Sequence, residues 1–111
     1  MSDLEITPVG KTVTAIFNGK VIAKSNKALN LVEGAYKPAI YFPKEDINMD
    51  LLSSTEKSTF CPRKGDASYW TISDGSKTSE DAAWAYEDPS QEAAQPLKGH
   101  IAFYNFVVKV E

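Results

Sequence analysis

The sequence is poor in several residue types on which common functional sites depend. It contains a single cysteine, Cys61, and a single histidine, His100. One cysteine excludes an internal disulfide and any zinc site built from several cysteines. One histidine likewise excludes a metal site built from several histidines. We therefore expect neither a bound metal nor a cofactor, and Cys61 and His100 are the only candidates of their kind for catalysis.

The chain also lacks an excess of positive charge and long hydrophobic runs. Lys and Arg together number 12 against 15 Asp and Glu, for a formal net charge of -3. Nucleic-acid-binding proteins typically present a basic face, so we expect no nucleic-acid partner. No segment approaches the roughly 18 apolar residues of a membrane helix. The start, residues 1–5, is acidic and has no apolar stretch, which is unlike a signal peptide. We expect a cytoplasmic protein with no membrane partner.

Length and composition indicate an ordinary folded protein. With 111 residues, of which 42% are hydrophobic and 24% charged, the chain fits one domain over residues 1–111. A chain of this size buries roughly 65% of its unfolded surface, which is enough for one core without disulfides.

Most of the chain has the pattern of short β-strands. Asn18-Gly19 separates two β-rich runs and predicts a hairpin, because both residues tolerate positive φ. A second hairpin is predicted around Asp74-Gly75. Further strands are expected at residues 30–33 and 39–42, with Pro43 ending the latter because proline has no N–H for the ladder. We predict a helical turn or a loop at residues 44–54 and another at residues 88–97.

Residues 100–110 alternate between apolar and polar positions, with a phase shift that a bulge at Tyr104-Asn105 would explain. We therefore predict one closing strand there. The whole pattern, about seven short strands with at most one or two helical turns, predicts an all-β, mainly antiparallel fold of sandwich or barrel type. No segment has the length and period of a crossover helix, which argues against a doubly wound α/β fold.

The most unusual stretch is residues 58–70. It holds the only cysteine and the only arginine, Arg63, followed by Lys64 and Gly65. Neighbouring cations favour the thiolate form of a cysteine, and a glycine lets the backbone approach a ligand. The stretch therefore predicts a reactive cysteine or an anion-binding turn. An alternative is a tight turn with a small buried thiol, solvated cations and a core formed by Tyr69 and Trp70.

His100 is the only side chain with a neutral unperturbed pKa and so the only obvious general base. A Cys61–His100 dyad is one hypothesis for catalysis. Carboxylates also cluster, at Glu45-Asp46, Asp50, Glu80-Asp81 and Glu87-Asp88. Paired acids can hold Mg²⁺ or act in acid–base catalysis, but solvated turns explain the same pattern more simply. Gly75-Ser76 followed by Glu80-Asp81 is only a weak match to a nucleotidyl-transfer arrangement, because the alternating acidic pair of two-metal chemistry is missing.

Aromatic residues fall on the predicted strands, often as adjacent pairs such as Tyr41-Phe42 and Tyr69-Trp70. Adjacent strand residues point to opposite faces, so one ring of each pair enters the core and the other lies on the opposite face. The second set of rings predicts either an aromatic-lined cavity or a covered second face. A cavity with Arg63, Lys64 or His100 at its mouth would suit a small anionic or planar ligand.

The central motif and the pieces around it resemble one bacterial family. The motif is Thr59-x-Cys61-Pro62-x-Lys64-Gly65-x-Ala67-x-Tyr69-Trp70. The flanking pieces are the Asn-Gly hairpin, Tyr41-Phe42-Pro43 with Glu45-Asp46, Ala83-Trp84-x-Tyr86-x-x-Pro89 and residues 99–104. Together they are similar to the domain-of-unknown-function family 427, over about residues 8–110.

This resemblance implies a β-tent-like fold, in which two antiparallel sheets lean together around a cleft. Relatives of that fold often bind zinc through paired Cys-x-x-Cys knuckles, which this chain lacks. The family also carries a nucleotidyltransferase label, which the residues of this chain do not support.

Three hypotheses follow. The first is a ligand-binding β domain with its site in the cleft between the sheets, formed by Tyr41, Cys61, Arg63, Lys64, Tyr69, Trp70, Trp84 and His100. The second is an enzyme with Cys61 as nucleophile and His100 as base. The third is an interaction module, in which residues 89–97 and an outward aromatic patch bind a protein or form a homodimer. We expect a monomer or a weak homodimer.

Overall fold

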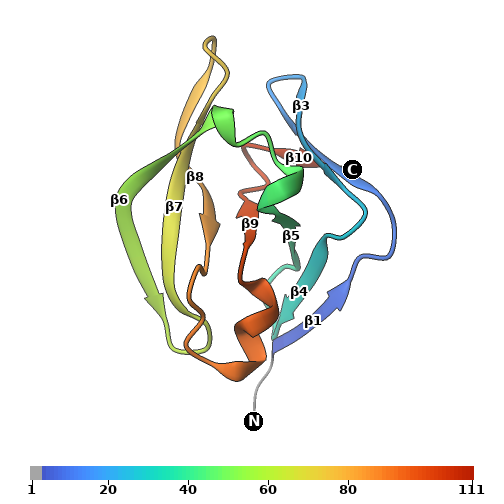
Figure 1. Ribbon diagram of the computed structural model, residues 1–111, viewed down its shortest axis with the longest axis vertical. Helices are drawn as coiled ribbons and strands as arrows, with labels where there is room; N and C mark the ends of the chain where they lie inside the picture. The colour runs from blue at the N-terminus through green and yellow to red at the C-terminus, as the bar shows by residue number, and fades with distance from the viewer. Residues whose placement is uncertain (1–3) are drawn as a thin grey trace.

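The computed structural model describes residues 4–111 and confirms the all-β, antiparallel class (Figure 1). Met1, Ser2 and Asp3, which entered the argument about a signal peptide, lie outside the described residues. Within the described chain, the strands are β1 (Leu4–Pro8), β2 (Val13–Phe17), β3 (Lys20–Ser25), β4 (Leu29–Glu33), β5 (Ala39–Pro43), β6 (Leu52–Cys61), β7 (Gly65–Ser73), β8 (Thr78–Ala85), β9 (His100–Phe103) and β10 (Lys109–Val110). Three short 3-10 turns accompany them: η1 (Lys44–Asp46), η2 (Met49–Leu51) and η3 (Glu92–Leu97).

The strands form two sheets in which every neighbouring pair is antiparallel. The large sheet has seven strands in the order β1-β4-β5-β9-β8-β7-β6, and the small sheet has three in the order β10-β2-β3. In Figure 1 the large sheet curves around from β6 to β1, and the short turn η3 lies at its lower end. Among residues 4–111 there is no helix with the length and apolar character needed to cross a membrane.

Both predicted hairpins are confirmed, and their tips lie next to each other (Figure 1). Asn18 and Gly19 have φ values of 51° and 79°, the positive angles that the turn between β2 and β3 requires. In the other turn, the Asp74 carboxylate accepts hydrogen bonds from the backbone N–H of Ser76 (2.9 Å) and Lys77 (2.8 Å). The Asn18 side-chain amide donates to Asp74 Oδ2 at 2.9 Å, so one hydrogen bond joins the two tips.

The strands predicted at residues 30–33 and 39–42 and the turn or loop at 88–97 are also confirmed, with Pro43 as the last residue of β5. The turn or loop predicted at residues 44–54 is confirmed for 44–51, whereas residues 52–54 already belong to β6. Two strands were not predicted from the sequence. One is β1, which pairs with β4, and the other is β6, which pairs with β7 at the edge of the large sheet. Apart from Leu52, the side chains of β6 are exposed or half-buried. A strand with water on both faces has no apolar alternation, so its pattern does not indicate a strand.

The prediction of a single closing strand at residues 100–110 is wrong. β9 ends at Phe103, and the backbone then turns, with the N–H groups of Val107 and Val108 both donating to the carbonyl oxygen of Tyr104 at 3.0 Å. The chain crosses to the small sheet and forms β10 there. The phase shift in the sequence therefore marks a change of sheet rather than a bulge.

Two clusters of buried side chains lie on opposite faces of the large sheet. The first fills the space between the two sheets, and among its members are Phe17, Phe42, Trp70, Ile101 and Phe103. The second lies on the other face, under η3, and includes Leu31, Tyr41, Tyr69, Tyr86, Ala102 and Leu97. Consecutive residues thus divide between the faces, as the aromatic pairs predicted: Tyr41 and Tyr69 lie on one face, and Phe42 and Trp70 on the other.

Candidate functional site

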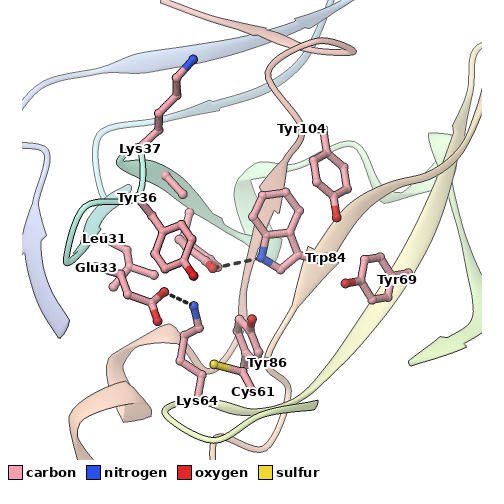
Figure 2. Close-up of a pocket in the computed structure, with 12 residues that line it drawn as sticks. Leu31, Glu33, Tyr36, Lys37, Cys61, Lys64, Tyr69, Trp84, Tyr86 and Tyr104 are labelled. Atoms are coloured by element: carbon pink, nitrogen blue, oxygen red, sulfur yellow. Dashed lines mark hydrogen bonds and ion pairs between the residues drawn. The ribbon is translucent and has the colours of Figure 1, made fainter. Parts of the chain in front are cut away.

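A cavity of about 470 Å³ opens on the second face of the large sheet, away from the small sheet (Figure 2). The space between the two sheets, where we expected the cleft, is instead occupied by the first core cluster. The cavity is lined by Leu31, Glu33, Tyr36, Lys37, Ala39, Tyr41, Cys61, Lys64, Tyr69, Trp84, Tyr86 and Tyr104. Its walls therefore come from β4 and β5 on one side, from β6, β7 and β8 on the other, and from the loop between β4 and β5.

Trp84 and the rings around it form one aromatic wall. The indole Nε1–H of Trp84 donates to the Tyr41 hydroxyl at 3.0 Å, and the two rings meet edge to face with centroids 6.2 Å apart. Tyr104 lies closer to Trp84, at 4.6 Å between centroids. Burial is the main cause that raises the pKa of Tyr41, and the hydrogen bond from Trp84 opposes it in part. The indole bond leaves the Tyr41 O–H free to donate to another group.

The remaining phenols add further hydroxyls. Tyr69 Oη lies 2.9 Å from Thr59 Oγ1 and is held by that hydrogen bond. Burial raises the pKa of Tyr86 and, to a smaller extent, that of Tyr104. Tyr86 and Tyr104 therefore stay protonated well above neutral pH, and their hydroxyls can donate hydrogen bonds.

One end of the cavity carries a charged corner formed by Glu33, Arg63 and Lys64. Lys64 is only 7% exposed, and its Nζ lies 2.5 Å from Glu33 Oε1 and 5.1 Å from the centroid of the Tyr86 ring. Arg63 approaches the other carboxylate oxygen of Glu33, at 3.5 Å. Two cations thus contact the same carboxylate at this end of the cavity.

Lys64 is positioned by the tight turn between β6 and β7. Its N–H donates to the carbonyl of Cys61, and its own carbonyl accepts from the N–H of Ser90, both at 3.1 Å. Gly65 follows with a φ of 114°, and a Cβ there would lie 3.0 Å from the Ser90 nitrogen. Only glycine fits this contact, so the motif that surrounds Cys61 shapes the turn that holds Lys64 at the cavity.

Five of the eight predicted site residues line the cavity: Tyr41, Cys61, Lys64, Tyr69 and Trp84. Arg63 does not line the cavity, but it contacts the carboxylate of Glu33, which does.

Two predicted site residues lie elsewhere. Trp70 belongs to the core between the sheets, because it follows Tyr69 in β7 and so points to the opposite face; Lys44 Nζ lies 5.3 Å from its ring centroid. His100 is not among the lining residues, and its Nδ1 lies 3.0 Å from the Lys98 carbonyl oxygen.

The proposed Cys61–His100 dyad gains no support from this arrangement. Cys61 ends β6 at the edge of the large sheet, whereas His100 begins β9, and β8 and β7 lie between these two strands. Cys61 lines the cavity as a half-buried thiol without His100 beside it in the lining.

Other lining residues were missed by the sequence analysis. Tyr86 and Tyr104 belong to the aromatic pattern and could have been found from it. No sequence pattern indicated a role for Glu33, Tyr36 and Lys37, which lie at the end of β4 and in the following loop. Only the fold brings them opposite Lys64.

Residues 4–111 contain no group of three or more His, Cys, Asp or Glu side chains arranged to hold a metal ion. Glu80 and Asp81, the weak counterpart of a nucleotidyl-transfer pair, lie on β8 and do not line the cavity.

Comparison with protein-family models gives one match, which covers residues 5–111. The matching family is described as "Domain of unknown function (DUF427)", and its model also has a nucleotidyltransferase label. A search of curated proteins returned no match for this chain.

Proposed function

The chain belongs to this family, whose description assigns no activity, and we propose from the site itself that the protein binds a small anionic or planar molecule in the cavity. The observation that carries the proposal is the combination of aromatic walls with a buried lysine, Lys64, at one end of the same cavity. Its volume of about 470 Å³ is in the range of small-molecule sites.

The aromatic walls favour a planar or apolar body for the ligand. Trp84 and Tyr104 offer ring faces close together, and Tyr41 presents its edge from the neighbouring side. Flat groups pack on such faces in stacked or edge-to-face geometry, which adds about 0.5–1.5 kcal/mol per ring pair beyond area burial.

The charged corner favours an anionic group. A carboxylate or phosphate at this end meets Lys64, whose positive charge is poorly solvated because the side chain is 9% exposed. Charge-assisted hydrogen bonds of this kind are roughly twice as strong as neutral ones. The phenol hydroxyls of Tyr41 and Tyr86 supply further donors to the same group.

The two tryptophans allow a direct test by NMR titration of isotope-labelled protein. Pools of nucleotides, sugar phosphates and small organic acids are added in turn. Binding in the cavity is expected to give saturable shifts of the Trp84 indole N–H, while the Trp70 indole, on the other face of the same sheet, shifts little. Equal shifts of both indoles, or none from any pool, would contradict the proposal.

A pair of lysine variants tests the charged corner. Lys64→Met removes the buried cation, and Lys44→Met removes an exposed one that pairs with Glu87 on the opposite side of the sheet from the cavity. We expect Lys64→Met to weaken binding of an anion at least tenfold and Lys44→Met to leave it nearly unchanged. Equal affinities for the two variants would show that the corner takes no part.

For the cellular location we propose the cytoplasm. A single half-buried thiol in the lining, with no second cysteine in the sequence, is typical of a reducing compartment. Fractionation of cells that express the full chain, with markers for each compartment, tests this proposal.

A further inference from the structure

We propose that the ligand is an amphipathic acid, with its anionic group at the Glu33–Arg63–Lys64 corner and an apolar tail that extends into a second, adjoining cavity. This inference rests on the proposed function and names the ligand class of that site. It depends on how the two cavities meet and on how differently they are lined.

The second cavity has a volume of about 520 Å³ and shares four lining residues with the first: Lys37, Ala39, Trp84 and Tyr104. Lys37 and Ala39 come from the β4–β5 side, and Trp84 and Tyr104 from the β8–β9 side. The two cavities therefore adjoin at these shared residues. In Figure 2, Lys37 and Tyr104 lie at one end of the view and the Glu33–Lys64 pair at the other.

The two cavities adjoin where β9 ends, beside the longer strand β5. β5 pairs with β9 only from Tyr41 to Pro43, and β9 ends at Phe103. The register thus places Ile40 level with Phe103, the last residue of β9, and Ala39 beyond the end of the strand, where the chain departs toward the small sheet. The second cavity lies in this opening, between the start of β5 and the segment that leads to β10.

The two cavities differ in chemical character. Beyond the shared residues, the second one is lined mainly by the apolar side chains of Pro38, Ile40, Phe103, Val108 and Val110. The first contains the buried Lys64 and Glu33 and most of the phenols. The two adjoining cavities are therefore charged at one end and apolar at the other.

The anionic group belongs at the Lys64 end rather than at the lysines of the second cavity. Lys109 is 73% exposed and pairs with Glu111 at 3.3 Å, and Lys37 is exposed as well. Water and salt screen such exposed cations, whereas the attraction of a buried cation for an anion is much stronger.

A series of alkyl carboxylates tests the assignment by isothermal titration calorimetry with the full chain. Butanoate, octanoate and dodecanoate are compared below their micelle concentrations. Each methylene that enters an apolar site raises affinity by up to about fourfold. We therefore expect octanoate to bind on the order of 100-fold more tightly than butanoate. Dodecyltrimethylammonium, with an equal tail and opposite charge, is expected to bind far more weakly than dodecanoate.

Substitutions in the second cavity provide the structural test. Ile40→Asn places an amide in the tail site and is expected to reduce the octanoate-to-butanoate affinity ratio at least tenfold. Val21→Asn is the matched control, because Val21 is also an apolar strand residue, is 58% exposed and lines neither cavity. If Ile40→Asn does not fold, as judged by circular dichroism, Val110→Asn in the same cavity replaces it.

The outcomes separate this inference from the proposed function. A rising affinity with chain length that Ile40→Asn removes and Val21→Asn preserves supports the amphipathic acid. Binding of butanoate with no dependence on chain length, or equal binding of dodecyltrimethylammonium, overturns the inference and leaves the anion site standing. No shift or heat from any acid or any pooled compound overturns both.

Discussion

Replacement of Gly65 by alanine tests the turn that holds Lys64 at the cavity. Gly65 has a φ of 114°, a conformation that L residues rarely adopt, and a Cβ there would meet the Ser90 backbone nitrogen at 3.0 Å and its Oγ at 3.2 Å. Gly75, in the β7–β8 hairpin, is the matched control, because it also has a positive φ, 87°, but no atom lies within 4 Å of its added Cβ.

The expected magnitudes differ because only one site adds a steric clash to the backbone strain. Gly75→Ala introduces only the strain of a positive φ, which lowers the free energy of unfolding by about 1 kcal/mol. Gly65→Ala has the same strain and must also displace the Ser90 backbone, which donates to the Lys64 carbonyl at 3.1 Å. We expect a total loss of about 2–4 kcal/mol. For a domain of this size, 1 kcal/mol corresponds to about 4 °C in Tm, so the two variants should differ by about 4–12 °C.

Urea and thermal unfolding, followed by circular dichroism and tryptophan fluorescence, measure both variants. The Lys64 position is read separately, from the affinity for an anionic ligand relative to the wild type. A Gly65→Ala protein no less stable than Gly75→Ala would refute the argument that the Ser90 contact requires glycine. A destabilised protein with unchanged anion affinity would show that the turn does not position Lys64.

Three further predictions concern other parts of the fold. Tyr41→Phe removes the acceptor of the indole N–H bond, which is 3.0 Å long, and should lower the unfolding free energy by about 1 kcal/mol and shift an indole N–H signal in NMR spectra. Phe42→Ala, at a fully buried position, should cost about 3–5 kcal/mol in urea unfolding, whereas Phe106→Ala, at a residue 81% exposed, should cost nearly nothing. The hydrogen bond from Asn18 is the largest cause that lowers the pKa of Asp74 below its ordinary 3.8, so this carboxylate contributes stability above about pH 4 that is lost as the pH falls toward its folded pKa. Asp74→Asn should therefore flatten the fall in Tm between pH 5 and pH 2.5, and an unchanged profile would contradict the role of Asp74.

The elements that were predicted from the sequence are those set by local chemistry. The Asn18-Gly19 and Asp74-Gly75 pairs determine their turns through positive φ and short side-chain bonds, which need no distant partner. The alternation of faces is equally local, so the two rings of each pair, Tyr41-Phe42 and Tyr69-Trp70, were predicted to lie on opposite faces, as they do.

The elements that were missed depend on partners far along the chain. β6 is a polar edge strand whose place follows from pairing with β7 rather than from its own pattern. Glu33 reaches Lys64 across 31 positions in sequence, so no spacing rule could have linked them.

The exclusion of Trp70 and His100 from the cavity has two different causes. For Trp70 the exclusion was predictable, because Tyr69 and Trp70 are adjacent in β7 and point to opposite faces of the sheet. Only one of the two can therefore line the cavity. For His100, the position of β9 within the sheet decides, and that position follows from the strand order β5-β9-β8.

The short strand β9 has a consequence for folding and local opening. It pairs with β5 through three residue pairs and with β8 through two, and it is the only strand that joins the β1-β4-β5 half of the large sheet to the β8-β7-β6 half in the described chain. Within each half the strands are mostly consecutive in sequence, whereas β9 follows all of them in the chain and has to insert between the two halves. Because contacts of high sequence separation form late, the two halves are expected to assemble first and to be joined last. The same seam should be where the native sheet opens at lowest cost in amide hydrogen exchange, and a molecule that touches Glu33 on one side and Tyr69 on the other would hold it closed.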